Sequence, residues 1–318
     1  MLEIRDYKNG DELEIINLFK DAFHKKLSLD LWKWNYNSNF FESKYIKLMW
    51  DKNILAGHYA VIPMKIQIGR KSLKSGLSMT TMTSSLYKKR GIFKELASSL
   101  YSETYNDINI IWGFPNDNSL HGFTKYLGWK HVADINMYRC DNCKNIKEYK
   151  NIKEYKNIKE VNFFDEKFDD LSEIIKNNYK FIVSRNSKYL NWRYREHSEN
   201  EYYCIVYEKD DMYLGYCVYK IYTVNNERYC DIVDIISINQ EIFKNILKYI
   251  ITKMSLMGVQ HLNMWMNDKE KLEVAKNIGF YKTDVVTHFG VRINCDYLNK
   301  EIYEFSNWYI TMGDSDVF

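Results

Sequence analysis

The sequence predicts an α/β protein made of two similar halves. Two observations lead to this fold class. The segment from Gly76 to Trp129 alternates apolar strand patterns with amphipathic helix patterns. In addition, Trp34-Asn35-Tyr36 recurs as Trp192-Arg193-Tyr194, which is an offset of 158 positions (192 − 34). A chain of 318 residues is long enough for two domains of ordinary size.

The elements of the first half follow from the spacing of their apolar residues. Residues 2–5 alternate as a short strand, and Asp11 opens a helix whose apolar residues recur at helical spacing up to Phe23. Polar turns separate the strands that come next. The expected strands are Tyr45–Trp50, Ile54–Pro63, Met64–Ile68, Leu77–Ser85, Ile108–Phe114 and Ala133–Cys140.

A basic, glycine-containing turn follows the strand at Leu77–Ser85. Three cations, Lys88 to Arg90, precede Gly91, and apolar residues at helical spacing begin at Ile92. The first turn of a helix presents unpaired N–H groups and the positive end of the helix dipole, and a glycine lets the backbone approach an anion. The turn therefore predicts a phosphate site, and a solvated basic turn is the alternative.

Taken together, residues 76–129 resemble the acetyl-CoA-binding core of the GCN5-related N-acetyltransferases (GNAT). The family's pyrophosphate loop reads Gln/Arg-x-x-Gly-x-Gly/Ala, and here Lys88 replaces its first residue and Phe93 its last. The family's Leu-Gly-Phe ending matches Leu127-Gly128-Trp129. The resemblance implies two tandem GNAT-like domains, each with a mixed, mostly antiparallel central sheet flanked by helices.

Acetyl-CoA is the co-substrate that this resemblance implies. Backbone N–H groups of the loop would bind the diphosphate, and the end of the preceding strand would pair with the pantetheine amides. Polar residues after the second strand would hold the pantetheine or the substrate, or would cap the helix that follows. The residues concerned are Thr81, Met82, Thr83, Lys88, Lys89, Arg90, Gly91, Ile92, Phe93, Lys94, Asn116, Asn118 and Ser119.

The general acid of many family members is a tyrosine four residues before the glycine of the Leu-Gly-Phe ending. That position is Thr124 in this sequence, and Tyr126 lies two residues out of register on another face of the helix. His121 and His58 are candidate bases, and the alternative for each is a structural histidine.

The C-terminal tail offers carboxylates at Asp314, Asp316 and the terminus of Phe318. Tandem acetyltransferases that resemble enhanced-intracellular-survival proteins use a C-terminal carboxylate as the base of the first domain. We therefore expect His121, Asp316 and Phe318 to be the catalytic candidates, and the alternative for the tail is a segment that only covers an apolar groove.

The second half reads as a degenerate copy. Gly57-His58-Tyr59 recurs as Gly215-Tyr216-Cys217, again 158 positions later, whereas Leu127-Gly128-Trp129 recurs as Ile278-Gly279-Phe280 after only 151. The second copy has thus lost about seven residues, and the loss falls on the phosphate turn, because Ile235–Gln240 contains neither glycine nor a basic cluster.

The expected domain organisation has four parts. Residues 144–160 repeat the charged unit Asn-Ile-Lys-Glu-Tyr-Lys and are read as a surface linker. The tail is too apolar to be free and is expected to dock on the body. The parts are an acetyl-CoA-binding domain at 1–140, the linker at 141–160, the degenerate domain at 161–297 and the docked tail at 298–318.

Composition excludes several classes of protein. With 45 basic and 42 acidic residues the net charge is only +3, so no nucleic-acid partner is expected. No apolar run approaches about 20 residues and the N-terminus lacks the form of a signal peptide, so we expect a cytoplasmic protein with no membrane partner. Cys140-Asp-Asn-Cys143 is a lone C-x-x-C pair without further ligands at similar spacing, and no metal is expected.

The function that these features favour is acetyl transfer from acetyl-CoA to a primary amine of a small molecule. By analogy with tandem members of the superfamily, the acceptor is an amino sugar or its nucleotide-linked form. Two alternatives stay open. One is aminoacyl or peptidyl transfer, which would need a surface that binds tRNA, and the other is a non-catalytic CoA-binding scaffold.

Overall fold

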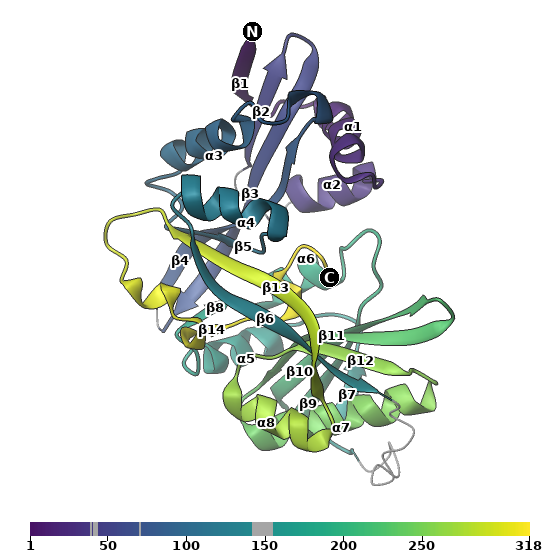
Figure 1. Cartoon of the computed structure of the whole chain (residues 1–318). Coiled ribbons are helices and arrows are strands. Elements are labelled where there is room, and N and C mark those ends of the chain that lie inside the picture. Colours follow the sequence, from purple (N-terminus) through teal and green to yellow (C-terminus); the bar gives the residue numbers. More distant parts are fainter. Residues whose placement is uncertain (39, 41–43, 70, 142–154) are drawn as a thin grey trace.

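The computed structural model describes residues 1–38, 40, 44–69, 71–141 and 155–318. All fourteen strands of this part of the chain belong to one continuous sheet that runs through both halves (Figure 1). Most neighbouring strands are antiparallel, and helices flank the sheet, so the expected mixed, mostly antiparallel α/β architecture is confirmed. None of the described helices combines the length and the apolar character needed to cross a bilayer.

The first half contains six strands and four α-helices. The strands are β1 (Leu2–Asp6), β2 (Tyr45–Asp51), β3 (Ile54–Ile68), β4 (Lys71–Thr83), β5 (Ile110–Gly113) and β6 (Lys130–Asp141). The helices are α1 (Glu12–Phe23), α2 (Leu29–Tyr36), α3 (Ile92–Glu103) and α4 (Asp117–Tyr126), and the short 3-10 turn η1 (Ser85–Tyr87) precedes α3.

Two strands differ most from the sequence prediction. The two strands expected at 54–63 and 64–68 are one strand, β3, that continues through Pro63. Pro63 is tolerated there because β2 pairs with β3 only as far as Val61, so no ladder bond to β2 needs the missing N–H. β4 begins at Lys71, six residues earlier than expected, because its first residues, although polar, pair with the end of β3 from Ile68 onward.

The second half repeats the order of the first. Its strands are β7 (Ile158–Val161), β8 (Phe181–Val183), β9 (Tyr203–Lys209), β10 (Met212–Val224), β11 (Glu227–Ser237), β12 (His261–Trp265), β13 (Tyr281–Ile293) and β14 (Trp308–Tyr309). Its α-helices are α5 (Lys167–Ile175), α6 (Ser187–Tyr194), α7 (Gln240–Leu256) and α8 (Lys269–Ile278), and the tail adds the 3-10 turns η4 (Lys300–Tyr303), η5 (Phe305–Asn307) and η6 (Met312–Asp314). Strand β7 occupies the end of the segment expected to be a linker, while residues 142–154 of that segment lie outside the described residues.

The halves exchange their last strands. β6, the final strand of the first half, pairs with β12 of the second half, and β13, the final strand of the second half, pairs with β5 of the first. Between them β6 and β13 pair with each other, and Figure 1 shows both ribbons crossing from one half into the other. The two halves are therefore one continuous unit of structure.

Packing around two equivalent glycines identifies α7 as the counterpart of α3. A Cβ atom on Gly57 would lie 2.4 Å from a side-chain atom of Ile92, and one on Gly215 would lie 3.0 Å from Ile242. Both glycines thus let a strand approach the first turn of the following helix closely. The internal repeat inferred from the sequence corresponds to a repeat in packing.

The tail returns to the body and is largely buried. Trp308 and Tyr309 form β14, which pairs with β8, and β8 also pairs with β3 of the first half. Residues Thr311 to Ser315 are buried in turn. The tail therefore ends between the two halves (Figure 1).

Candidate functional site

The loop between β4 and α3 has the backbone conformation of an anion-binding turn. Lys89 has φ +63° and Gly91 has φ +79°, and Gly91 is the N-cap residue of α3. The first hydrogen bond of the helix runs from the N–H group of Glu95 to the carbonyl oxygen of Gly91, at 3.1 Å. The N–H groups that precede Glu95 therefore have no helical carbonyl as a partner. Lys88, Lys89 and Arg90 are exposed, which leaves their charges available to an anion.

The neighbouring strand β4 has an open edge. β4 and β5 pair in parallel only from Ser75 to Leu77, and the pairing ends at Trp112 on β5. From there the two strands diverge, while the other edge of β4 stays paired with β3 as far as Thr83. The main-chain groups of β4 that face the gap are thus available to a ligand, and Thr81, Met82 and Thr83 lie along this part of the strand.

A bulge marks the middle of this open edge. The register between β3 and β4 shifts between His58 and Ala60, and Thr80 has φ +53°, which is unusual for a β-branched residue. The carbonyl of Thr80 is turned to the Nδ1 atom of His58 at 2.8 Å. Such bulges re-aim backbone groups and are frequent next to active sites.

At the N-terminus of α4, two of the three expected ligand side chains serve the helix itself. The Asn116 side chain accepts from the N–H groups of Asn118 and Ser119 at 3.1 and 3.0 Å, and the Ser119 hydroxyl accepts from Asn116 N–H at 3.1 Å. This is a capping box. The Asn118 side chain is exposed, and it is the one of the three that the cap does not use.

A cavity of about 220 Å³ lies between the two halves. Its first-half wall includes Leu77 and Met79 of β4 and Trp112 of β5, so it borders the place where these strands diverge. Its other walls come from α2, α6, the segment after α6 and the tail. They include Leu31, Trp34, Asn35, Tyr189, Trp192, Arg193, His197, Glu199, Asn200, and residues Gly313 to Phe318.

Arg193 fixes the tail at this cavity. Its Nε donates to Gly313 O at 3.0 Å, and its Nη2 donates to Ser315 O at 2.9 Å and also to the main-chain oxygen of Phe318. The ring of Phe318 packs edge-on against Trp265, with 5.1 Å between ring centroids. These contacts hold the carboxylate of Asp316, which lies between the anchored residues, at the cavity wall.

The environment of Asp316 suits a base. The side chain is accessible to solvent, but the protein around it desolvates the carboxylate and raises its pKa, against smaller opposing effects from a main-chain hydrogen bond and Arg193. A carboxylate with a raised pKa holds a transferred proton more firmly than an ordinary surface carboxylate.

Two neighbouring buried polar groups of the first half, neither of which lines the cavity, have no hydrogen-bond partner among the described residues. They are the hydroxyl of Tyr36 and the Nε2 atom of His58, whose rings contact edge-on at 5.9 Å. Burial lowers the pKa of His58 to about 4, so its imidazole is neutral at pH 7. Burial raises the pKa of Tyr36, against a smaller opposing effect from the Thr80 side chain, and the charge of Asp316 adds to the rise.

The second half satisfies the equivalent groups with its own chain. Tyr194 and Tyr216 take the places of Tyr36 and His58, 158 positions later, and both hydroxyls donate to Asp234 Oδ2, at 3.3 and 2.8 Å. Arg185 joins the same carboxylate to Asp314 of the tail, at 3.0 and 2.8 Å. The second half therefore supplies, through Asp234 of β11, the partner that the first half lacks, and the tail joins this cluster through Asp314.

The second half also lacks the phosphate turn. β11 ends at Ser237 and α7 begins at Gln240, capped by Asn239, whose side chain accepts from Ile242 N–H at 2.9 Å. The eight residues that separate β4 from α3 are reduced to two. No glycine and no cation stands between these elements.

His121 lies apart from the cavity. It is exposed on α4, and its ring contacts that of Tyr126 edge-on, with 6.1 Å between the centroids. Thr124 donates to Leu120 O at 2.9 Å, as a threonine inside a helix commonly does, and Tyr126 is exposed. The structure thus brings Asp316 and Phe318 together at the cavity and leaves His121 outside it.

Sequence reasoning did not find the aromatic and acidic cavity wall. Trp34, Trp192 and Glu199 line the cavity, and Trp192 is at the same time a buried core residue. The sequence did contain an indication of this wall, since Trp34 and Trp192 are 158 positions apart. Residues that are equivalent in an internal repeat can meet at its two-fold axis, as the hydrogen bond between these two residues shows.

The comparisons with known proteins agree with this geometry. A family model described as an acetyltransferase (GNAT) domain matches residues 3–132. No curated protein sequence matches the chain.

Solved structures match nearly the whole chain. They include a GCN5-related N-acetyltransferase from Anabaena variabilis (TM-score 0.72, 12% identity, covering 92% of this chain and 73% of that one). A probable N-acyltransferase from Enterococcus faecalis has a TM-score of 0.69 and 14% identity, and covers 92% and 72%. A GCN5-related N-acetyltransferase from Kribbella flavida has a TM-score of 0.70 and 9% identity, and covers 92% and 71%. At these identities the similarity establishes the fold.

Proposed function

Because the chain is an acyltransferase of the GNAT superfamily, with its family domain at residues 3–132, we propose that it moves an acetyl group from acetyl-CoA to a primary amine. The observation that carries the proposal is the cavity between the halves. Its wall contains both the diverging strand β4, through Leu77 and Met79, and the carboxylate of Asp316. Donor and acceptor would meet at this point.

Acetyl-CoA would bind to the first half alone. The diphosphate would accept from the N–H groups at 89–93, with the charges of Lys88, Lys89 and Arg90 around it. The pantetheine would add to the open edge of β4 and bring the thioester to the bulge at Thr80. Asn118 is the side chain after β5 that remains available to the pantetheine.

The acceptor must reach the thioester as a neutral amine. Asp316 would attract the ammonium form and take one of its protons, directly or through a water molecule. The amine then attacks the thioester carbonyl, and main-chain N–H groups at the bulge would stabilise the oxyanion. As the C–N bond forms and the C–S bond breaks, the nitrogen loses its second proton and CoA leaves as the thiol.

The walls of the cavity favour a particular acceptor. Trp34 and Trp192, which stack on each other, contribute apolar atoms to the wall, while Glu199 and Asp316 offer negative charge and Asn200 a neutral polar group. A polar ring that bears an amine, such as an amino sugar or its nucleotide-linked form, combines these needs. A cytoplasmic location belongs to the same proposal, since acetyl-CoA is available there.

Thiol release from acetyl-CoA, measured with a panel of amines, tests the function. We expect turnover with at least one cationic ring amine, and a fall of about 10²-fold or more in kcat for Asp316→Asn with the affinity for acetyl-CoA unchanged. If acetyl-CoA binds but no amine releases the thiol, the chain is a CoA-binding scaffold. If Asp316→Asn turns over at the normal rate, Asp316 is not the base, and the terminal carboxylate of Phe318 at the same cavity becomes the next candidate.

A further inference from the structure

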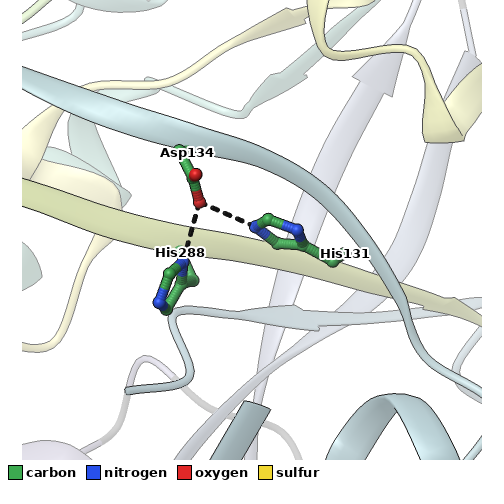
Figure 2. Close-up of side chains that lie close together, drawn as sticks. All are labelled: His131, Asp134 and His288. Carbon is green, nitrogen blue, oxygen red and sulfur yellow. Dashed lines mark hydrogen bonds and ion pairs between the residues drawn. The ribbon is translucent and has the colours of Figure 1, made fainter. Parts of the chain in front are cut away.

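Two histidines and an aspartate from β6 and β13 converge on one point. His131 Nε2 lies 2.9 Å from Asp134 Oδ1, and His288 Nδ1 lies 2.7 Å from the same oxygen. Figure 2 shows the carboxylate between the two imidazole rings. The three ligand atoms lie within 4.8 Å of one another.

A β-bulge places these side chains on one face of the sheet. Asp134 is opposite His288, whereas His131 is opposite Gly290, so β6 has one extra residue between the two pairs. Residues three apart on a regular strand point to opposite faces. Because of the extra residue, the side chains of His131 and Asp134 point to the same face of the sheet. Bulges of this kind often re-aim a side chain next to a functional site.

A fourth residue orients His288 as a metal-binding histidine is oriented. Its Nε2 lies 2.8 Å from Oδ1 of Asp117, the first residue of α4, while its Nδ1 faces the cluster. Histidines that bind metals usually donate their second ring N–H to a carboxylate in this way, which fixes the tautomer and the direction of the ring. This contact is independent of the three converging atoms.

From this geometry we infer that His131, Asp134 and His288 bind a Zn²⁺-type divalent ion, with Asp117 as the residue that orients His288. Imidazole nitrogen and carboxylate oxygen are ligands that Zn²⁺ accepts at bonds of about 2 Å, which puts tetrahedral ligand atoms roughly 3.3 Å apart. The present separations of 2.7 and 2.9 Å need to open only slightly. His131 and Asp134 are exposed and His288 is partly exposed, so an ion can enter and water can complete its coordination.

The bound ion would join parts of both halves. His131 and Asp134 belong to the last strand of the first half, His288 to the last strand of the second, and Asp117 to the helix beside Asn118. The site lies outside the cavity, since none of its residues lines that wall. The ion would therefore bridge β6 and β13, the two strands that the halves exchange. This inference does not depend on the proposed acetyl transfer.

Calorimetry with Zn²⁺, and Co²⁺ absorption as a report of coordination, test the site on the untagged full chain after treatment with a chelator. We expect one ion per chain and a rise in Tm of about 5 °C at a 100-fold excess over Kd. His288→Gln and Asp134→Asn should each abolish binding, and Asp117→Asn should weaken it about 10- to 100-fold.

His261→Gln is the matched control, because His261 contacts two carboxylates, Asp141 and Glu227, without a second imidazole. This variant should bind Zn²⁺ like the unmodified chain. Absence of stoichiometric binding to the unmodified chain would overturn the inference. Binding that survives in both His288→Gln and Asp134→Asn would do so as well, because the ion would then lie elsewhere.

Discussion

The indole rings of Trp34 and Trp192 stack on each other across the boundary between the halves. Their centroids are 5.0 Å apart and their planes differ by 9°. Each N–H donates to the main-chain carbonyl of the other residue, from Trp34 at 2.8 Å and from Trp192 at 3.2 Å. The contact is reciprocal because the two residues are equivalent in the internal repeat, and it places a local two-fold axis at the wall of the cavity.

Reciprocity makes the two tryptophans energetically coupled. Phenylalanine at either position keeps a ring but removes an N–H and leaves a carbonyl of the other residue without its donor. We expect Trp34→Phe and Trp192→Phe to show a coupling free energy of about 1 kcal/mol in a double-mutant cycle of urea unfolding. A cycle of Trp34→Phe with Trp50→Phe, which share no stacking contact, should be additive. Additivity in the first cycle would mean that the paired hydrogen bonds do not contribute to stability.

Gly91 should be essential for binding acetyl-CoA. Its φ of +79° disfavours any other residue by roughly 1–2 kcal/mol, and a carboxylate there would repel the diphosphate. Gly91→Glu is expected to abolish the single binding event seen by calorimetry with acetyl-CoA. Gly258→Glu is the matched control, since Gly258 has φ +72° and open space around it, but follows α7 in the second half. Two acetyl-CoA sites per chain, or unchanged affinity in Gly91→Glu, would contradict the assignment of the loop.

The pH dependence of turnover should report on Asp316. Its pKa is raised above the ordinary aspartate value, and a base works only when deprotonated. The value of kcat/KM should therefore rise with pH through an acidic limb whose midpoint lies above that of a surface aspartate. Asp316→Asn should remove this limb, whereas Asp284→Asn, an exposed carboxylate on β13, should keep it. A limb that persists in Asp316→Asn would belong to another group.

His58 should make the native state sensitive to acid. Its native pKa of about 4 is depressed from 6.5, so below pH 6.5 the unfolded chain binds a proton that the native chain does not. The contribution of His58 to the free energy of unfolding is therefore fully present above pH 6.5 and is lost as the pH drops towards 4. His197, also at about 4, contributes in the same direction.

Between pH 6.5 and 5, the free energy of unfolding of the unmodified chain should fall. In His58→Gln this fall should be smaller by about 2 kcal/mol, measured by urea unfolding. Comparison of each protein with itself at two pH values separates this effect from any general destabilisation by the substitution. His24→Asn, at the exposed end of α1, should show the same loss as the unmodified chain. An equal loss in His58→Gln would mean that His58 is protonated in the native state.

Local sequence was sufficient to predict most helices and strands of the first half and the loop between β4 and α3. The residues 88–93 are contiguous, and one positive-φ glycine before a helix is visible in the sequence as a physical constraint. Likewise the shortened connection before α7 follows from counting residues between repeated motifs. Whether the loop binds acetyl-CoA stays a prediction, because neither its geometry nor its charge identifies the anion.

Contacts between distant residues could not be predicted in the same way. The cavity brings Met79, Trp192 and Asp316 together from three separate parts of the chain. The proximity of the His131 and Asp134 side chains could not be predicted for a different reason. They are three apart on a strand, a spacing that normally separates side chains to opposite faces, and only the bulge opposite β13 aligns them. His288 follows more than 150 positions later.

The exchange of β6 and β13 also determines when the chain can finish folding. During synthesis, β5 obtains its outer neighbour only after residues 281–293 have been made, close to the end of the chain. Until then Ile110 to Gly113 present an unpaired strand edge, which is a known hazard for aggregation. Pairings between such distant segments also slow folding, because a long loop must close before the contact forms. The first half, although it comes first in the sequence, is therefore completed only near the end of synthesis.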